Sequence, residues 1–185
     1  AIDKYAFYEC KKLESIDISS SKYLGEYAFQ NCSNLKDIKG LDKFTIIPSF
    51  AFSNTAITSL DLPLCEVVGD GAFYNCSKLE SISLPICTTI NGGVKTNQWS
   101  SVYGTFANCT KLQKLDLPKC TNISGYAFQN CTNLASLNIP VCQSLGVYSF
   151  GSCNSLNEVA LPATIRSLGY RCFDGNTLLT LNSTE

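Results

Sequence analysis

Histidine is absent from the 185 residues of this chain, and so is methionine. The missing histidine excludes Ser-His-Asp and Cys-His nucleophiles and every metal site that uses an imidazole ligand. An excess of positive charge is also lacking, because 14 Lys and Arg residues accompany 15 Asp and Glu residues, for a net charge of -1. We therefore expect no partnership with nucleic acid, which binds to strongly basic surfaces.

Long apolar runs are missing too. The longest contain only a few residues, too short to cross a bilayer, so we expect no membrane insertion in this segment. No charged-then-apolar leader opens the sequence. The chain begins and stops within a repeat and shows no dedicated cap, which suggests a piece of a longer array or end-to-end self-association. Hydrophobic residues make up 45% of the chain, enough to bury a core.

What the sequence does contain is a repeat. The phrase "YAFQNCSNL" at 27–35 returns as "YAFQNCTNL" at 126–134. The phenylalanine of this phrase, or its equivalent, recurs every 21 to 23 residues apart from one interval of 33. The eight positions are Phe7, Phe29, Phe52, Phe73, Phe106, Phe128, Phe150 and Phe173. A period near 22 is typical of a solenoid, in which each coil buries its apolar side against its neighbours.

Each repeat contains two local patterns. In "LDLP", Leu60 and Leu62 flank one outward polar residue, and this alternation predicts a short strand with one buried face, ended by proline. Phe128, Cys131 and Leu134 lie at i, i+3 and i+6, which predicts a single helical or 3₁₀ turn. We therefore expect an α/β solenoid with a parallel sheet on its concave face and short helical or 3₁₀ turns on the other side.

Aligned by column, the repeats read xAFxNCxxLxxLxLPxCxxIGxY. This pattern resembles the BspA-like (Treponema pallidum-type) leucine-rich repeat family over essentially all of residues 1–185. The resemblance implies a right-handed coil stack in a single array of about eight coils of ~22 residues. The first and last coils are incomplete, and an 11-residue insertion falls within about 91–102. Three local irregularities depart from the pattern: "IKGLDKF" in coil two, Thr55 in place of a cysteine, and the insertion itself.

The eleven cysteines raise the question of disulfides or metal. Most recur at equivalent positions of successive coils, where parallel side chains about 4.8 Å apart do not match the Cβ–Cβ separation that a disulfide prefers. No C-x-x-C pair is present to suggest a zinc site. We interpret the cysteines as free thiols that pack as small apolar side chains, with an isolated disulfide as the alternative. We expect no metal and no cofactor.

The outward strand positions are the candidate ligand-binding residues. They are Ser15, Asp17, Asp37, Lys39, Ser59, Asp61, Ser81, Ser83, Lys114, Asp116, Ser136 and Asn138, to which we add Trp99 in the insertion. Solenoids offer extended surfaces of this kind to partners. The alternative is a sheet face that is polar because it is solvated, since the stripe has no aromatic anchor. Trp99 could likewise fold back onto the solenoid flank instead of meeting a partner.

These residues and the resemblance together predict a function. Members of the family occur mostly on the surface of bacteria and some protozoa or are secreted, and the family is linked to adhesion. The resemblance therefore implies a non-enzymatic extracellular or cell-surface protein that adheres to a protein or glycan on a host or neighbouring cell. The alternative is a structural spacer with no ligand of its own.

Overall fold

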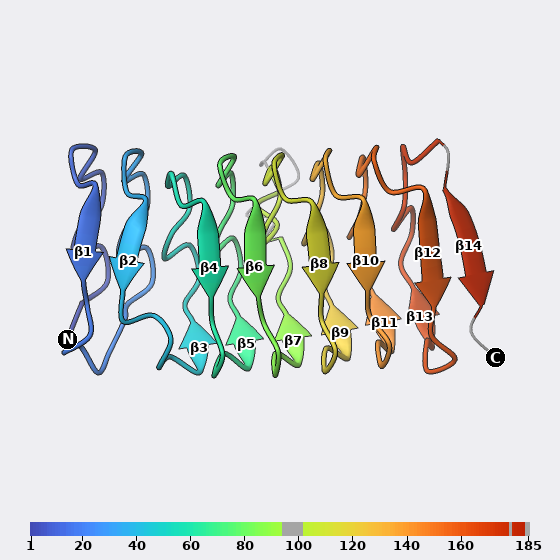
Figure 1. Cartoon of the computed structure of the whole chain (residues 1–185), viewed down its shortest axis with the longest axis horizontal. Helices are drawn as coiled ribbons and strands as arrows, with labels where there is room; N and C mark the ends of the chain where they lie inside the picture. Colours follow the sequence, from blue (N-terminus) through green and yellow to red (C-terminus); the bar gives the residue numbers. More distant parts are fainter. Residues whose placement is uncertain (94–101, 178, 184–185) are drawn as a thin grey trace.

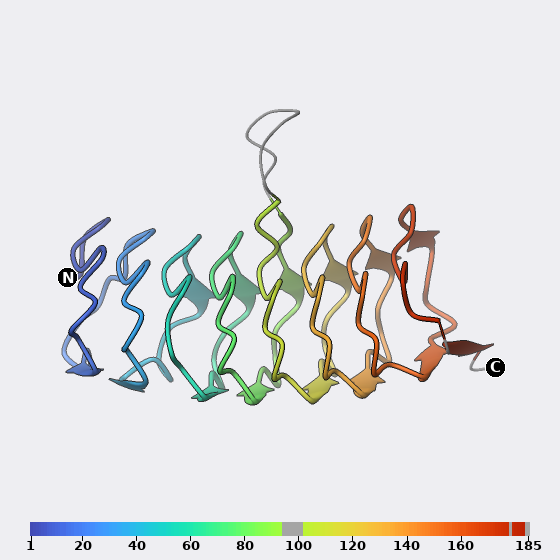
Figure 2. The same ribbon diagram turned by 90° about the horizontal axis from the view of Figure 1, so that it is seen from above.

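Figure 1 shows the computed structural model of the chain, which describes residues 1–93, 102–177 and 179–183. The described residues form strands and turns arranged as a stack of coils, and the two ends of the chain lie at opposite ends of the stack. Seen from above, the row of coils bends only slightly (Figure 2). The predicted solenoid is confirmed. The predicted insertion at about 91–102 falls largely outside the described residues, and the division into eight coils stays a prediction.

The longer strands lie side by side along the front of Figure 1. They are β1 (Ser15–Asp17), β2 (Asp37–Lys39), β4 (Ser59–Asp61), β6 (Ser81–Ser83), β8 (Lys114–Asp116), β10 (Ser136–Asn138), β12 (Glu158–Leu161) and β14 (Thr180–Ser183). Successive strands pair in parallel, β1 with β2, β4 with β6, β8 with β10 and β12 with β14. The predicted parallel strands are therefore confirmed, each ending close to the proline where the repeat contains one.

A second row of strands was not predicted from the sequence. It contains β3 (Ile46–Ile47), β5 (Val67–Val68), β7 (Thr89–Ile90), β9 (Asn122–Ile123), β11 (Ser144–Leu145) and β13 (Ser167–Leu168), which form one six-stranded parallel sheet. Each strand has only two residues, too few for alternation to be recognised in the sequence. In five of the six strands one residue is buried, as Val68 and Ile90 are, and this row closes a second side of each coil.

The prediction of helical or 3₁₀ turns on the remaining side was wrong, because the described residues contain no helix of any kind. In coil two, Tyr27 and Asn31 have φ of 58° and 63°, in the left-handed region that a right-handed helix cannot include. Both donate their amide to the next coil, Tyr27 to the Ser49 carbonyl at 3.0 Å and Asn31 to the Ser53 carbonyl at 2.9 Å. The third side is therefore a series of turns hydrogen-bonded from coil to coil.

The repeated phenylalanines form the centre of the core. From Phe7 to Phe173 each ring stacks on the next, with centroids 5.0–5.6 Å apart and planes within 13° of parallel. The six inner rings are fully buried. The column before the phenylalanine holds alanine in most coils, as at Ala28 and Ala127, which are also fully buried. This continuous aromatic stack passes through every coil, including the 33-residue one.

All eleven cysteines are free, and all but Cys10 are buried. The thiol of Cys131 donates to the Phe106 carbonyl of the preceding coil at 3.2 Å, and Cys153 does the same to Phe128. Burial raises the pKa of the Cys153 thiol to about 12 and that of Cys76 to about 11. The interpretation of the cysteines as packing residues is confirmed, with the added role of hydrogen-bonding one coil to the next.

Candidate functional site

The predicted binding residues occupy the outward positions of the long strands, which we call the strand face. Of the thirteen, twelve are solvent-exposed: Ser15, Asp17, Asp37, Lys39, Ser59, Asp61, Ser81, Ser83, Lys114, Asp116, Ser136 and Asn138. The middle residue of each strand, such as Leu60 or Leu115, points into the core, as strand alternation requires. Trp99, the thirteenth, lies outside the described residues.

At the N-terminal end of the strand face, Asp17 and Lys39 are opposite one another on β1 and β2, and Lys39 Nζ lies 3.1 Å from Asp17 Oδ2. The backbone amide of Ser19 also donates to Asp17 Oδ1 at 2.9 Å. The hydrogen bonds from Ser19 and the nearby Lys39 ammonium lower the pKa of Asp17 to about 2. The Asp17 carboxylate is therefore already engaged within the protein.

Further along the face, β8 and β10 repeat this pairing with an amide. Asn138 Nδ2 donates to Asp116 Oδ1 at 2.8 Å, and Lys114 lies opposite Ser136. The structure thus brings the predicted residues together in pairs, across strands that are hydrogen-bonded to each other.

Two carboxylates of the face differ from the others. Asp17 has an ion pair and Asp116 accepts a hydrogen bond from Asn138, whereas in the described part of the chain Asp37 and Asp61 have neither an ion pair nor a side-chain hydrogen bond. Both side chains are exposed, Asp37 on β2 and Asp61 on β4. A cationic side chain of a partner can therefore pair with either carboxylate without breaking an ion pair within the protein.

Between β2 and β4 the strand face is interrupted. Both strands are fully described, yet they do not pair, and no Cα atom of β2 lies within 8 Å of a Cα atom of β4. Paired neighbours are about 4.8 Å apart, so this separation is too large for direct hydrogen bonding. Figure 1 shows it as the widest gap between neighbouring long strands.

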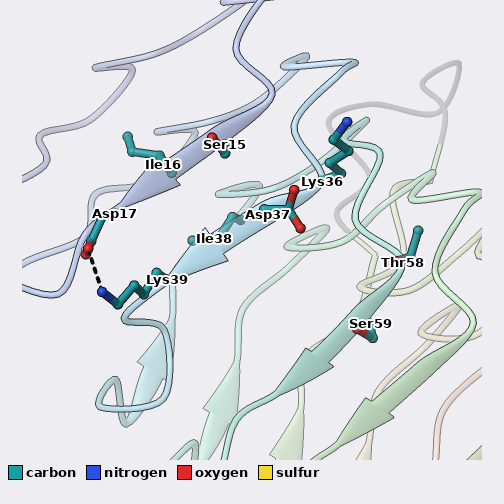
Figure 3. A pocket seen from close by; sticks show the side chains of 9 residues that line it. All are labelled: Ser15, Ile16, Asp17, Lys36, Asp37, Ile38, Lys39, Thr58 and Ser59. Carbon is teal, nitrogen blue, oxygen red and sulfur yellow. Dashed lines mark ion pairs between the residues drawn. The ribbon is translucent and has the colours of Figure 1, made fainter.

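A hollow of about 600 Å³ lies at this gap (Figure 3). It is lined by Ser15, Ile16, Asp17, Lys36, Asp37, Ile38, Lys39, Thr58 and Ser59, and so by the first two strands and the start of β4. A smaller hollow of about 300 Å³ lies where β6 and β8 adjoin. The larger hollow therefore extends over β1 and β2 and reaches the start of β4, where the long strands separate.

The interruption continues around the coil to the second row of strands. Leu24 forms an isolated parallel bridge with Ile2 of the preceding coil, but the six-stranded sheet ends at β3, and Leu24 and Ile47 do not pair. A hollow of about 350 Å³ separates the two, lined by residues 22–24 and 26 on one side and by residues 44–46 and 48 on the other. We call this opening, between residues 19–39 and residues 43–61, the seam.

The seam is closed on the turn side. The amides of Tyr27, Phe29 and Asn31 all donate across it to the next coil. Asn54 Nδ2 donates to Asn31 Oδ1 at 2.7 Å, and the phenylalanine stack passes through without a break. The two coils are thus joined along the turn side and separated along the strand side, like a wedge. Lys43 crosses the opening, because its ammonium donates to the Ile18 carbonyl at 3.0 Å and to the Ser19 carbonyl.

The sequence of coil two explains the wedge. Ile38 and Ile47 are nine positions apart, whereas the equivalent Leu60 and Val68 are eight apart. The extra residue is taken up near Gly40, whose φ is 91°, and Phe44 occupies the place that Cys65 has in the next coil. The same nine-residue spacing separates Val159 from Leu168, where both strands pair with a neighbour, so the feature peculiar to coil two is the larger side chain of Phe44. Sequence reasoning registered "IKGLDKF" only as an irregularity, although it was the signal that could have located the seam.

Comparison with known proteins agrees with this architecture. A family model described as "BspA type Leucine rich repeat region (6 copies)" matches residues 1–98 and 102–185. A comparison with the curated proteins found no match. In the described residues no helix is long and apolar enough to cross a membrane.

Three solved structures are similar to the chain. A leucine-rich repeat protein from Bacteroides ovatus is 25% identical with a TM-score of 0.71, and the match covers 99% of this chain and 55% of that one. One from Eubacterium ventriosum is 21% identical with a TM-score of 0.72, covering 93% and 44%. A leucine rich cell surface protein from Faecalibacterium prausnitzii is 22% identical with a TM-score of 0.56, covering 97% and 56%. The chain therefore spans about half the length of these proteins.

Proposed function

Because the chain belongs to the BspA-type leucine-rich repeat family, we propose that it is a non-enzymatic binding module of a cell-surface or secreted protein. Its partner is a protein or glycan on a host or neighbouring cell, and its binding surface is the strand face. The observation that carries the proposal is the exposure of all twelve described candidate residues in regular rows on a rigid stack. Solenoids use such extended surfaces for recognition.

Location outside the cell is part of the same proposal. It is supported by the similarity to the Faecalibacterium prausnitzii protein, which is described as a cell surface protein. The free thiols do not oppose it, because ten of the eleven are buried and protected from oxidants in solution.

A second candidate is a structural spacer, and one observation favours it. None of the twelve described candidate residues is aromatic or arginine, the types that contribute most of the binding energy in protein interfaces. In that case the stack would present other domains and the polar side chains would serve only to keep the sheet face soluble.

The test is binding of the purified chain to an array of extracellular-matrix proteins, glycans and bacterial cells. A triple variant, Asp61→Ala with Lys114→Ala and Asp116→Ala, removes charges from the strand face, and Trp99→Ala tests the insertion. A control with Asp3→Ala, Lys12→Ala and Glu66→Ala removes the same charges from exposed positions elsewhere.

A partner that binds the wild-type chain and the control, but not the triple variant, would support a binding module that uses the strand face. Loss in Trp99→Ala alone would move the binding surface to the insertion. Failure of the wild-type chain to retain any partner would leave the spacer as the better description.

A further inference from the structure

The seam exposes backbone groups that other strands use for pairing. The Ile18 amide donates to the Lys39 carbonyl at 2.8 Å, and the Asp37 amide donates to the Glu14 carbonyl at 3.3 Å, so residues 37 and 39 of β2 face β1. Successive residues of a strand direct their backbone groups to opposite edges. The amide and carbonyl of Ile38 therefore face the seam.

The opposite edge of the seam is open in the same way. The Leu62 amide donates to the Ser83 carbonyl at 3.1 Å, so Leu62 and Leu60 face β6. The intervening residues Ser59 and Asp61 then direct their amides and carbonyls toward β2. No hydrogen bond joins β2 to β4, although every residue of both strands is described. Two parallel edges thus face each other across the gap.

The gap is too wide for direct pairing of β2 with β4, and its lower bound is compatible with one added strand. A strand that hydrogen-bonds to both neighbours requires about 9.5 Å between them, twice the usual spacing. The edges are more than 8 Å apart at every Cα pair of β2 and β4, and the hollow that reaches this place is larger than the one where β6 and β8 adjoin. A peptide chain can therefore enter where a strand of the protein itself is missing.

The side chains around the gap set the sequence of such a peptide. Neighbouring residues on adjacent strands point to the same face of a sheet. A peptide residue between Ile38 and Leu60 would point toward the core and should be apolar. The residue before it would point outward beside Asp37. The residue after it would point outward beside Asp61 and beside Lys39, whose ammonium is already paired with Asp17. Neither Asp37 nor Asp61 has an ion-pair partner among the described residues.

We infer that the seam binds an extended peptide segment of a partner protein by strand addition, with an apolar residue flanked by lysine or arginine. This deepens the proposed function and takes from it the premise that the strand face binds a partner. Strand addition obtains affinity from main-chain hydrogen bonds and specificity from alternate side chains. Both are available at the seam. The junctions between β6 and β8 and between β10 and β12 are also unpaired, but Cα atoms there come within 8 Å of each other, which is closer than an inserted strand allows.

The probe is the blocked peptide Thr-Lys-Val-Lys-Thr, titrated into the intact chain while backbone amide signals are followed by NMR. We expect shifts centred on the amides of Ile38, Ser59 and Asp61. The affinity of a Thr-Glu-Val-Glu-Thr peptide should be lower by a factor of about five or more, because its carboxylates lie beside those of Asp37 and Asp61. A peptide with N-methylvaline at its centre, which lacks one donor, should also bind about five-fold more weakly.

Variants of the protein complete the test. Asp37→Asn with Asp61→Asn should weaken the lysine peptide about five-fold and bring it close to the glutamate peptide. Asp116→Asn, on the paired strands β8 and β10, is the matched control and should leave binding unchanged. Equal effects of the two sets of variants, shifts centred elsewhere, or no shift at millimolar peptide would overturn the inference.

The two proposals fail separately. Array partners retained without peptide binding would overturn the seam inference and keep the proposed function. Peptide binding at the seam without any array partner would overturn the proposed adhesive role and keep the seam as a peptide site.

Discussion

The junction between β2 and β4 and the junction between β4 and β6 have similar cores and different surfaces. At both, the phenylalanine rings stack, with centroids 5.4 Å apart for Phe29 and Phe52 and 5.6 Å for Phe52 and Phe73. Only the second junction carries paired long strands. The stack of rings and the turn side therefore hold successive coils together without help from the sheet, which leaves the sheet free to open.

The largest expected effect is a difference in stability loss between a substitution in the core and one at the seam. Phe128→Ala removes a fully buried ring that stacks on both neighbours, and should lower the free energy of unfolding by about 3–5 kcal/mol. Phe44→Ala at the half-buried seam position should lower it by only about 1–2 kcal/mol. Denaturant titration of both variants measures the contrast. A larger loss for Phe44→Ala would mean that the seam carries the stability of the stack.

Thiol reactivity separates Cys10, the one exposed thiol, from the ten buried ones. A thiol reagent should label Cys10 rapidly in the native protein and the other ten at least about 100-fold more slowly, because they need an opening of the structure. Rapid labelling should vanish in Cys10→Ser and reach all eleven thiols of the wild-type chain in denaturant.

The buried thiols also predict that the folded state loses stability at alkaline pH. Folding raises the pKa of Cys76 from 9.0 to about 11, so the native state favours the neutral thiol. The stability that this provides is complete below pH 9 and is lost as the pH rises from 9 through about 11. The free energy of unfolding should fall across this interval, and the fall should be smaller in Cys76→Ala.

The closed side of the seam depends on Asn54. Its amide donates to Asn31 and accepts from Asn75, both at 2.7 Å, and its φ is 58°. Asn54→Ala removes both bonds and places a Cβ-bearing residue with no polar side chain in the left-handed region, so we expect a loss of about 2 kcal/mol. Asn54→Gly loses the bonds alone and should cost about 1 kcal/mol. Equal losses in denaturant titrations would show that backbone conformation contributes nothing here.

Hydrogen exchange compares the two edges of β4 directly. The amides of Ser59 and Asp61 face the seam, and those of Leu60 and Leu62 face β6. We expect the first pair to exchange about ten-fold faster or more, because they have no partner strand. Equal protection of the four amides would contradict the open edge on which the seam inference rests.

The smallest expected effect concerns Asp17. Its pKa falls from 3.8 to about 2 on folding, so its contribution to stability is present above pH 3.8 and disappears as the pH falls through 2. Asp17→Asn should therefore be slightly less stable than the wild-type chain at neutral pH and equal to it near pH 2. Asp61→Asn, whose carboxylate has no ion-pair partner among the described residues, is the control.

Much of this architecture could be predicted from the sequence because each coil repeats the same packing. The alternation around Leu60 and Leu62 located the long strands, and their outward polar residues proved to be exposed. The 22-residue period placed the phenylalanines, and these form the stack. Repetition makes such features visible, since a residue that is required once is required in every coil.

Two features could not be predicted: the turns, which depend on backbone geometry, and the seam, which depends on the irregular coil two. Spacing of i, i+3 and i+6 suggested a helical turn at Phe128, but the left-handed residues Tyr126 and Asn130 on either side rule it out. Tyrosine rarely adopts positive φ, so the sequence did not indicate the left-handed conformation of Tyr126. The seam coincides with one phenylalanine in coil two, Phe44, and the amount by which the coils separate there depends on packing in three dimensions.

The row of asparagines on the turn side has a consequence for where this chain can be produced. Asn31, Asn108 and Asn130 each begin an Asn-Cys-Ser or Asn-Cys-Thr triplet, the acceptor signal for N-glycosylation. Asn130 Nδ2, the atom to which a glycan would attach, already donates to Asn108 Oδ1 at 2.7 Å. A sugar there would compete with the contact between coils, so a cell that attaches glycans before the chain folds would assemble a weakened stack.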